Sequence, residues 1–247
     1  MQDLLLYFFL TLGASALFGV IGLGSSLLLI PLFTLLGVDF NFAKVIGLFI
    51  NGLTTVSLTL HNVKSGLISF KEISFLIIVS ALFALMGAYS SQFISQTVVK
   101  YMLIAFILLS VTLLYMGHKK ETSQSHALHP FFLVTFVSVI AFIGGLIGVG
   151  GGAVYLPLLI LTGITTKKSI AITSALIPIV SFSGFLTYTS FVAIDWNLLA
   201  VVGVAAFLGG TLGHKMMNTI KNEKNLKVLI SVLLLGISVL MILKEIL

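Results

Sequence analysis

The chain contains the same interrupted hydrophobic pattern twice. Residues 19–24 (GVIGLG) and residues 145–150 (GLIGVG) each lie six residues before a proline–leucine pair. The offset, 145 − 19 = 126, persists downstream as far as the pair Gly87 and Gly213. A repeat of this length in an apolar chain indicates a duplicated membrane unit. Glycines that break a hydrophobic stretch leave backbone N–H and C=O groups unpaired, which a bilayer tolerates only within the protein or along a cavity.

The composition is that of an integral membrane protein. Hydrophobic residues make up 59% of the chain and charged residues only 8%, whereas a soluble domain carries about 25% charged residues. The absence of cysteine excludes disulfides and thiol nucleophiles. All 13 basic residues are lysines, so no guanidinium can bind an anion in a bidentate manner. The net charge of +6 lies in loop lysines, which indicates membrane orientation rather than nucleic-acid binding.

The hydrophobic runs predict an all-α polytopic membrane protein with two homologous repeats. Eight long runs approach the roughly 20 residues that cross a bilayer, and a ten-residue run follows each glycine break. We therefore expect eight long transmembrane helices and two short glycine-broken half-helices, with Pro31 and Pro157 as structural hinges. The long runs are residues 4–20, 43–60, 73–90, 98–116, 131–149, 169–191, 197–216 and 226–243, and the short ones are 27–36 and 153–162.

The predicted organisation is a first transmembrane repeat (1–116), a polar linker (117–129) and a second transmembrane repeat (130–247). If the short runs count as crossings, ten lysines fall on the cytoplasmic side and three outside, whereas eight crossings give eight against five. The lysine bias therefore favours about ten crossings. Five crossings per repeat is an odd number, so the repeats would be inverted and both termini would lie outside.

The glycine breaks are the best candidates for a binding site. The N-terminal ends of the half-helices would present unpaired N–H groups and a partial positive charge to an anion. Asn51 lies inside a span, and its amide cannot be satisfied by its own helix alone. We predict that the substrate-binding residues are Gly22, Gly24, Ser25, Ser26, Asn51, Gly148, Gly150, Gly151, Gly152, Thr173 and Ser174.

Simpler explanations stay open for several residues. Glycines allow close helix packing, which is the prediction for Gly13, Gly203 and Gly236. Ser and Thr hydroxyls can bond to their own helix backbone. Lys44 is predicted to snorkel to the membrane interface.

The two embedded histidines, His61 and His214, are candidate proton carriers, although a helix-end position at the headgroup level also accounts for them. The chain has no catalytic triad, zinc-protease or nucleotide-binding motif, and no acidic residue deep within a span. We therefore predict no enzyme activity, no metal site and no cofactor.

One set of motifs resembles a known family. Residues 145–158 (GLIGVGGGAVYLPL), 171–174 (AITS) and 194–196 (IDW) are similar to the TauE/SafE family of sulfite and organosulfur-anion exporters. The resemblance covers essentially the whole chain and is closer in the second half, since Ser25 and Ser26 replace two glycines in the first. It implies a permease of the prokaryotic inner membrane that moves small anions.

The sequence therefore predicts a secondary transporter for a small anion such as sulfite, an organosulfonate or a related sulfur or carboxylate compound. Alternating access would rock one repeat against the other. The expected partners are the anionic solute and the lipid bilayer, with no nucleic acid, and a homo-oligomer stays open. The alternative is a membrane-embedded binding or assembly partner of another membrane protein, without transport activity.

The natural absence of cysteine gives a direct test of the ten-crossing topology. A cysteine introduced by Ser123→Cys should resist an impermeant thiol reagent in intact cells, because ten crossings place the linker inside. The reagent should label the same variant after the cells are permeabilised. Ready labelling of intact cells would contradict the ten-crossing topology.

Overall fold

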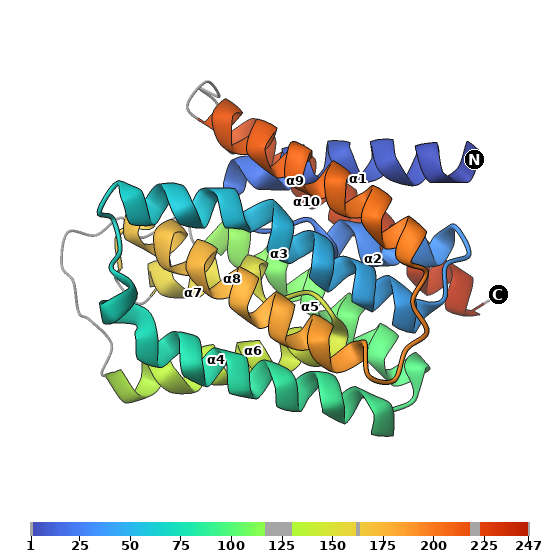
Figure 1. The fold of residues 1–247 in the computed structure, drawn as a ribbon, viewed down its shortest axis with the longest axis horizontal. Helices are drawn as coiled ribbons and strands as arrows, with labels where there is room; N and C mark the ends of the chain where they lie inside the picture. The colour runs from blue at the N-terminus through green and yellow to red at the C-terminus, as the bar shows by residue number, and fades with distance from the viewer. Residues whose placement is uncertain (1, 117–129, 162–163, 218–222, 247) are drawn as a thin grey trace.

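The computed structural model describes residues 2–116, 130–161, 164–217 and 223–246 (Figure 1). Within these ranges the chain forms ten α-helices and one short 3-10 helix, with no strand. In chain order they are α1 (Gln2–Ile21), α2 (Ser26–Leu35), α3 (Phe40–Lys64), α4 (Phe70–Ser90), η1 (Ser91–Phe93), α5 (Gln96–Met116), α6 (Pro130–Ile147), α7 (Gly152–Leu161), α8 (Thr166–Tyr188), α9 (Trp196–Met217) and α10 (Glu223–Ile246).

The prediction of an all-α fold is confirmed for the residues that the structure describes. Judged by length and composition alone, five helices among the described residues can cross a membrane: α3, α4, α5, α8 and α9. The apolar parts of α1, α2, α6 and α10 are shorter. Large hydrophobic side chains are exposed along the outer helices, α4, α5 and α9 among them, as expected of surfaces that face lipid.

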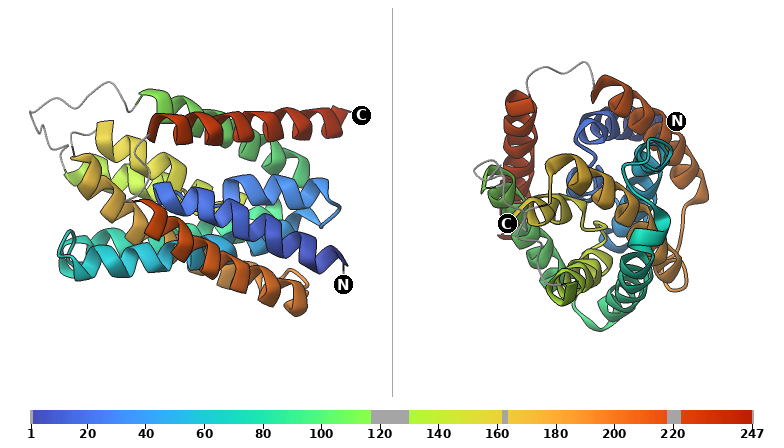
Figure 2. Two further views of the ribbon diagram at one scale, coloured as in Figure 1. Left: turned by 90° about the horizontal axis from the view of Figure 1, so that it is seen from above. Right: turned by 90° about the vertical axis from the view of Figure 1, so that its left-hand side faces the viewer.

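Corresponding helices of the two sequence repeats have corresponding neighbours. Helix α1 packs on α9, and its repeat equivalent α6 packs on α4, the equivalent of α9. In the same way α3 packs on α9 and α8 packs on α4. Helix α3 lies against α8, and α5 lies beside α10 on one flank (Figure 2). Each half of the chain therefore completes its packing only against the other half.

The equivalent helices run in opposite directions along the bundle. Helix α1 begins at the end of the long axis where both chain termini lie, and α6 begins at the other end (Figure 1). Helices α4 and α9 are opposed in the same way. The chain therefore runs along the bundle five times and reverses direction four times within each half, provided that the ten-residue helices α2 and α7 are counted.

The closest helix contacts depend on glycine. A Cβ atom on Gly87 of α4 would collide with the carbonyl oxygen of Phe142 on α6. A Cβ atom on Gly213 of α9 would collide with the carbonyl oxygen of Ala16 on α1. Both pairs are related by the offset of 126 residues, so the duplicated glycines serve the same backbone-to-backbone approach in each half.

The predicted packing role of the single glycines is right for one of three. Gly203 has the ring of Phe49 2.6 Å from the position of its missing Cβ atom, whereas nothing lies within 4 Å of that position at Gly13 or Gly236. The prediction is wrong for these two because a sequence does not show which way a residue faces on its helix.

The contacts of the glycines predict opposite effects of the same substitution. Gly87→Ala and Gly213→Ala should each lower the free energy of unfolding by roughly 1–3 kcal/mol, because the methyl group meets a backbone carbonyl that cannot move aside. Gly13→Ala should be neutral or stabilising by up to about 1 kcal/mol, since alanine favours a helix. Thermal unfolding in detergent measures all three, and equal midpoints would contradict this packing.

Candidate functional site

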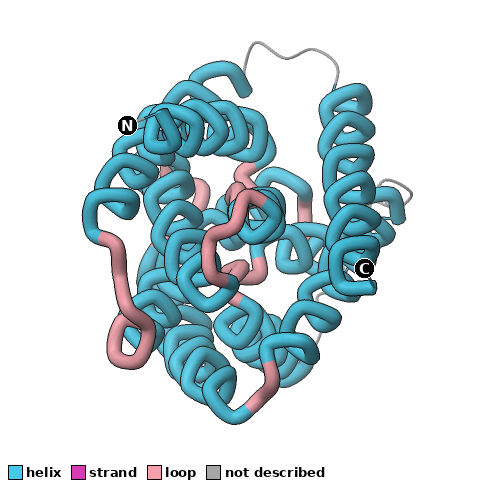
Figure 3. The backbone as a smooth tube through the Cα atoms, turned by 90° about the vertical axis from the view of Figure 1, so that its right-hand side faces the viewer, coloured by secondary structure: helices cyan, strands magenta, loops and turns pink. Residues whose placement is uncertain are grey.

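Both predicted helix interruptions are present. Helix α1 ends at Ile21 and α2 begins at Ser26, while α6 ends at Ile147 and α7 begins at Gly152. The short helices have ten residues each, as predicted, and begin one residue earlier than expected. Loop segments lie inside the ring of helices as well as at its end (Figure 3).

The breaks turn on glycines in the left-handed region of backbone conformation. Gly24 has a φ of 75° and Gly150, its repeat equivalent, a φ of 67°. Residues with a Cβ atom rarely adopt these values. The sharp turn sends each short helix back toward the end of the bundle from which the preceding helix came.

The two breaks touch each other in the interior. Ser26, the first residue of α2, donates a hydrogen bond of 2.9 Å from its hydroxyl to the carbonyl of Val149 in the other break. Gly152, its repeat equivalent, faces the carbonyl of Leu23 so closely that a Cβ atom would collide with it. Leu23 and Val149 are themselves equivalent positions of the repeat. The start of each short helix therefore contacts a carbonyl of the other break, and the contact has approximate two-fold symmetry.

The side chain of Asn51 lies between the two breaks. Its Nδ2 donates to the carbonyl of Val149 at 3.1 Å and to the hydroxyl of Ser181 at 3.1 Å. A Cβ atom on either Gly24 or Gly150 would collide with this amide. Because a carbonyl can only accept a hydrogen bond, the orientation of the amide is determined. The other atom, Oδ1, is buried and has no hydrogen-bond donor.

The first residues of both short helices have unpaired backbone N–H groups at the contact between the breaks. Within the described part of the chain, the N–H groups of Ser26 and Leu27 in α2 donate no hydrogen bond, and neither do those of Gly152 and Ala153 in α7. Such groups carry the positive end of a helix dipole. The contact between the breaks therefore combines several buried N–H donors with one buried acceptor, Asn51 Oδ1.

Other residues of the predicted set line the breaks without joining the contact. The hydroxyl of Ser25 bonds that of Ser15 on α1 at 3.0 Å, and Thr54 donates to Ser15 at 3.2 Å. The remaining turn glycines pack on neighbouring side chains. These contacts are Gly22 with Leu58, Gly148 with Lys44 and Gly151 with Ile140.

Thr173 and Ser174 lie on α8, and the contacts of Ser174 are with α3. The hydroxyl of Ser174 accepts a hydrogen bond of 2.9 Å from Asn62, and its carbonyl accepts one from Thr59. The hydroxyl of Thr173 is buried without a partner. Ser174 therefore belongs to the α3–α8 interface, and among the described residues no hydrogen bond links Ser174 or the hydroxyl of Thr173 to the breaks.

The two prolines occupy equivalent positions in the short helices. Pro31 and Pro157 are each the sixth residue of their helix, in the second turn rather than the first. Proline lacks an N–H, so the carbonyls four residues earlier, in Leu27 and Ala153, lose their usual donor. A hinge at either proline stays a prediction.

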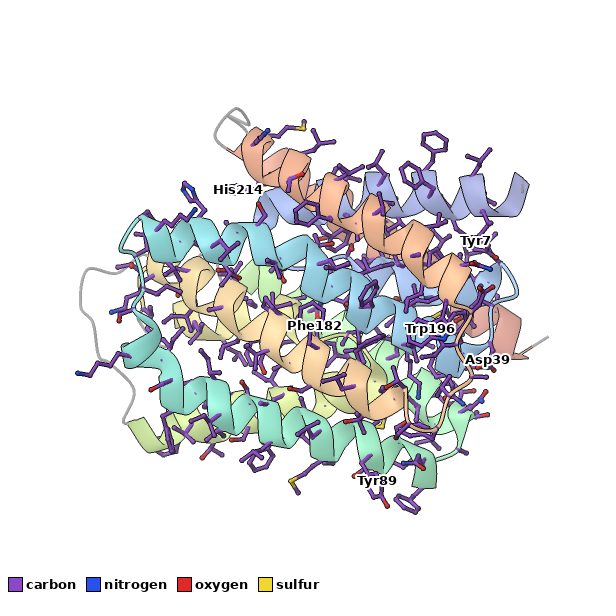
Figure 4. The ribbon with its side chains drawn as sticks, in the orientation of Figure 1. Tyr7, Asp39, Tyr89, Phe182, Trp196 and His214 are labelled. Atoms are coloured by element: carbon purple, nitrogen blue, oxygen red, sulfur yellow. The ribbon has the colours of Figure 1, made fainter. Side chains whose placement is uncertain are left out.

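The two candidate proton carriers meet at the end of the bundle away from the chain termini, where His61 is exposed and His214 is half-buried. His61 and His214 lie in the last turns of α3 and α9, with ring centroids 4.7 Å apart and planes inclined at 55°. The Nδ1 atom of His214 is buried without a hydrogen-bond partner. Figure 4 labels His214 at this end and Asp39 at the other.

The predicted set missed two hydroxyls that contact the site. Ser181 binds Asn51, and Ser15 binds Ser25. The repeat could have revealed Ser181, because its equivalent is Thr55 and both copies thus carry a hydroxyl there. Ser15 gave no such signal, since its equivalent is Ala141.

Comparison with known proteins agrees with the architecture. The family model described as "Sulfite exporter TauE/SafE" matches residues 7–241. A probable membrane transporter protein from Methanocaldococcus jannaschii is 25% identical over 176 residues, which span 68% of this chain and 65% of that protein. A probable membrane transporter protein from a Sinorhizobium species is 28% identical over 249 residues, spanning 95% and 93% of the two chains.

No solved structure gives a significant match to the chain. The family model, in contrast, covers nearly all of it, including both glycine breaks and the helices that enclose them. The chain therefore belongs to the TauE/SafE sulfite exporter family of membrane transporters.

Proposed function

We propose that the protein is a secondary transporter of a small oxyanion, such as sulfite, an organosulfonate or a related sulfur or carboxylate compound. The anion would be held at the N-termini of α2 and α7. The observation that carries this proposal is the meeting of the two glycine breaks around Asn51. The family description, which names sulfite, supports the class of solute.

The groups at the contact suit an oxyanion that still carries a hydrogen. Its charged oxygens can accept hydrogen bonds from the helix N–H groups, in a chain whose sequence contains no arginine. Its O–H can donate to Asn51 Oδ1, which has no donor in the structure. Among the proposed solutes, hydrogensulfite would satisfy both kinds of unpaired group, whereas a deprotonated sulfonate or carboxylate group would satisfy the N–H donors alone.

The burial of the breaks supports alternating access. Gly24, Ser26, Asn51 and Gly150 are all buried, so a solute can reach them only if neighbouring helices separate. The bonds that would open join the two halves of the chain: Ser26 to Val149, and Asn51 to Ser181. We propose that one repeat rocks against the other at this contact.

The proposal includes ten crossings in two inverted repeats, in a prokaryotic inner membrane with both termini outside. The opposite directions of α1 and α6 and of α4 and α9 support this arrangement. The helix neighbours also match between the repeats: α1 packs on α9 as α6 packs on α4, and α3 packs on α9 as α8 packs on α4.

Asn51→Ala should lower the uptake of sulfite into proteoliposomes at least about tenfold, because the amide at the contact is lost. The matched control is Asn62→Ala, which removes another buried asparagine of α3, one that binds Ser174 rather than the breaks. That variant should transport at a rate close to wild type.

Uptake by Asn51→Ala equal to that of Asn62→Ala would contradict the proposed site. If the wild-type protein instead moved no anion from a panel of sulfite, sulfonates and carboxylates, and always co-purified with one membrane protein, the assembly role would replace transport.

We also propose that His61 and His214 carry a proton that is coupled to the anion. The close approach of their rings and the unpartnered Nδ1 of His214 support a shared proton. His214→Gln should therefore flatten the pH dependence of uptake between about pH 5 and 8. The control is His126→Gln in the linker, which should keep the wild-type slope, and an unchanged slope in His214→Gln would contradict the coupling.

A further inference from the structure

Lys44 is the only fully buried charged side chain among the residues that the structure describes. It is 1% exposed, although it lies in the second turn of α3, where a snorkelling lysine is expected to reach the interface. That expectation is wrong, because η1 and the end of α8 cover this part of α3. A buried ammonium is costly unless it is paired, and an ionisable residue inside a membrane protein is by default a functional candidate.

The surroundings of the ammonium leave it undercompensated. Its Nζ donates one hydrogen bond of 2.9 Å to the hydroxyl of Ser91. It lies 4.7 Å from the ring centroid of Tyr188 and 5.3 Å from that of Phe40, both within the range of cation–π attraction. No ion pair between Lys44 and a carboxylate occurs within the described ranges, and the carboxylate of Asp39 caps α3 by accepting from the N–H of Phe42. Among the described residues, the hydroxyl of Ser91 is thus the single hydrogen-bond acceptor for the three N–H donors of Lys44.

The aliphatic part of Lys44 lies directly on the second glycine break. A Cβ atom on Gly148 would stand 2.7 Å from the Cβ of Lys44. Asn51 is seven residues, or two helical turns, further along α3, and so lies on the same face about 10 Å away. One face of α3 therefore presents a charge first and then the amide at the contact between the breaks.

Only one of the two breaks has this charge. The repeat equivalent of Lys44 is Ile170, whose side chain lies 3.8 Å from the missing Cβ position of Gly22. The second break is therefore covered by an ammonium group, at the end of the bundle where α3 begins and where Figure 4 labels Asp39. The first break is covered in the equivalent place by the apolar side chain of Ile170.

We propose that Lys44 forms a second anion subsite, where the ammonium and the hydroxyl of Ser91 bind the oxyanion before it reaches Asn51. This inference rests on the proposed function and adds a binding residue and a side of approach to it. The ligand is a small oxyanion, because its negative charge can pair directly with the buried ammonium, which the carboxylate of Asp39 attracts without forming an ion pair. Its oxygens can also accept hydrogen bonds from the remaining N–H donors of Lys44.

The test measures sulfite transport in proteoliposomes and thermal stabilisation by sulfite in detergent. Lys44→Met keeps an apolar stem over Gly148 and removes the charge. It should raise the KM for sulfite at least about tenfold, with a smaller change in kcat, and should reduce the stabilisation by sulfite. Lys44→Arg should recover part of both. The matched control is Lys71→Met, an exposed lysine on α4, which should behave like wild type.

A wild-type KM and wild-type stabilisation by sulfite in Lys44→Met would overturn the subsite. So would a variant whose unfolding temperature without anion falls while its KM is unchanged, because Lys44 would then serve packing alone. If sulfite stabilises the wild-type protein through Lys44 but is not transported, the proposed function fails and the subsite stands. If sulfite, sulfate and acetate are neither transported by the wild-type protein nor stabilise it, both fail.

Discussion

The structure depends on how an apolar interior satisfies backbone groups that a helix no longer pairs. Each glycine break frees N–H and C=O groups, and hydrocarbon offers them no partner. Here the carbonyl of Val149 in one break receives donors from Ser26 and Asn51 in the other half of the chain. The second break therefore has a backbone group whose hydrogen bonds come from the first half of the chain, which ties the two halves together at a common centre.

The polar side chains at and beside the contact between the breaks come mainly from the first repeat. At three equivalent positions the first copy has a polar side chain, and the second has glycine or isoleucine. The pairs are Ser26 with Gly152, Asn51 with Ile177 and Lys44 with Ile170. The second copy, which carries the clearer family motif, contributes mostly bare backbone. The two related halves thus present different side chains to the contact between the breaks. In the proposed transport cycle, this difference determines the side from which the anion approaches.

Much of the local structure could be predicted from the chain. The glycine clusters and the ten-residue runs after them predicted α2 and α7 to within one residue. Asn51 stood out because its amide needs partners outside its own helix. Side-chain environments could not be predicted in the same way. Lys44 has the sequence context of an interfacial lysine, and only the folding of η1 and α8 over it makes it buried. Gly13 and Gly236 resemble the packing glycines in sequence but face open space.

The sequence by itself determined the class of protein, the duplication, and the positions where helices must break, because these follow from hydrophobicity, chain length and the conformational freedom of glycine. Only the tertiary structure decided that the two breaks meet, that Asn51 lies between them, and that one lysine is enclosed beside them. The physical reason is distance along the chain: the partners of Asn51 are 98 and 130 residues away, and no local pattern specifies which distant backbone group will accept its hydrogen bonds.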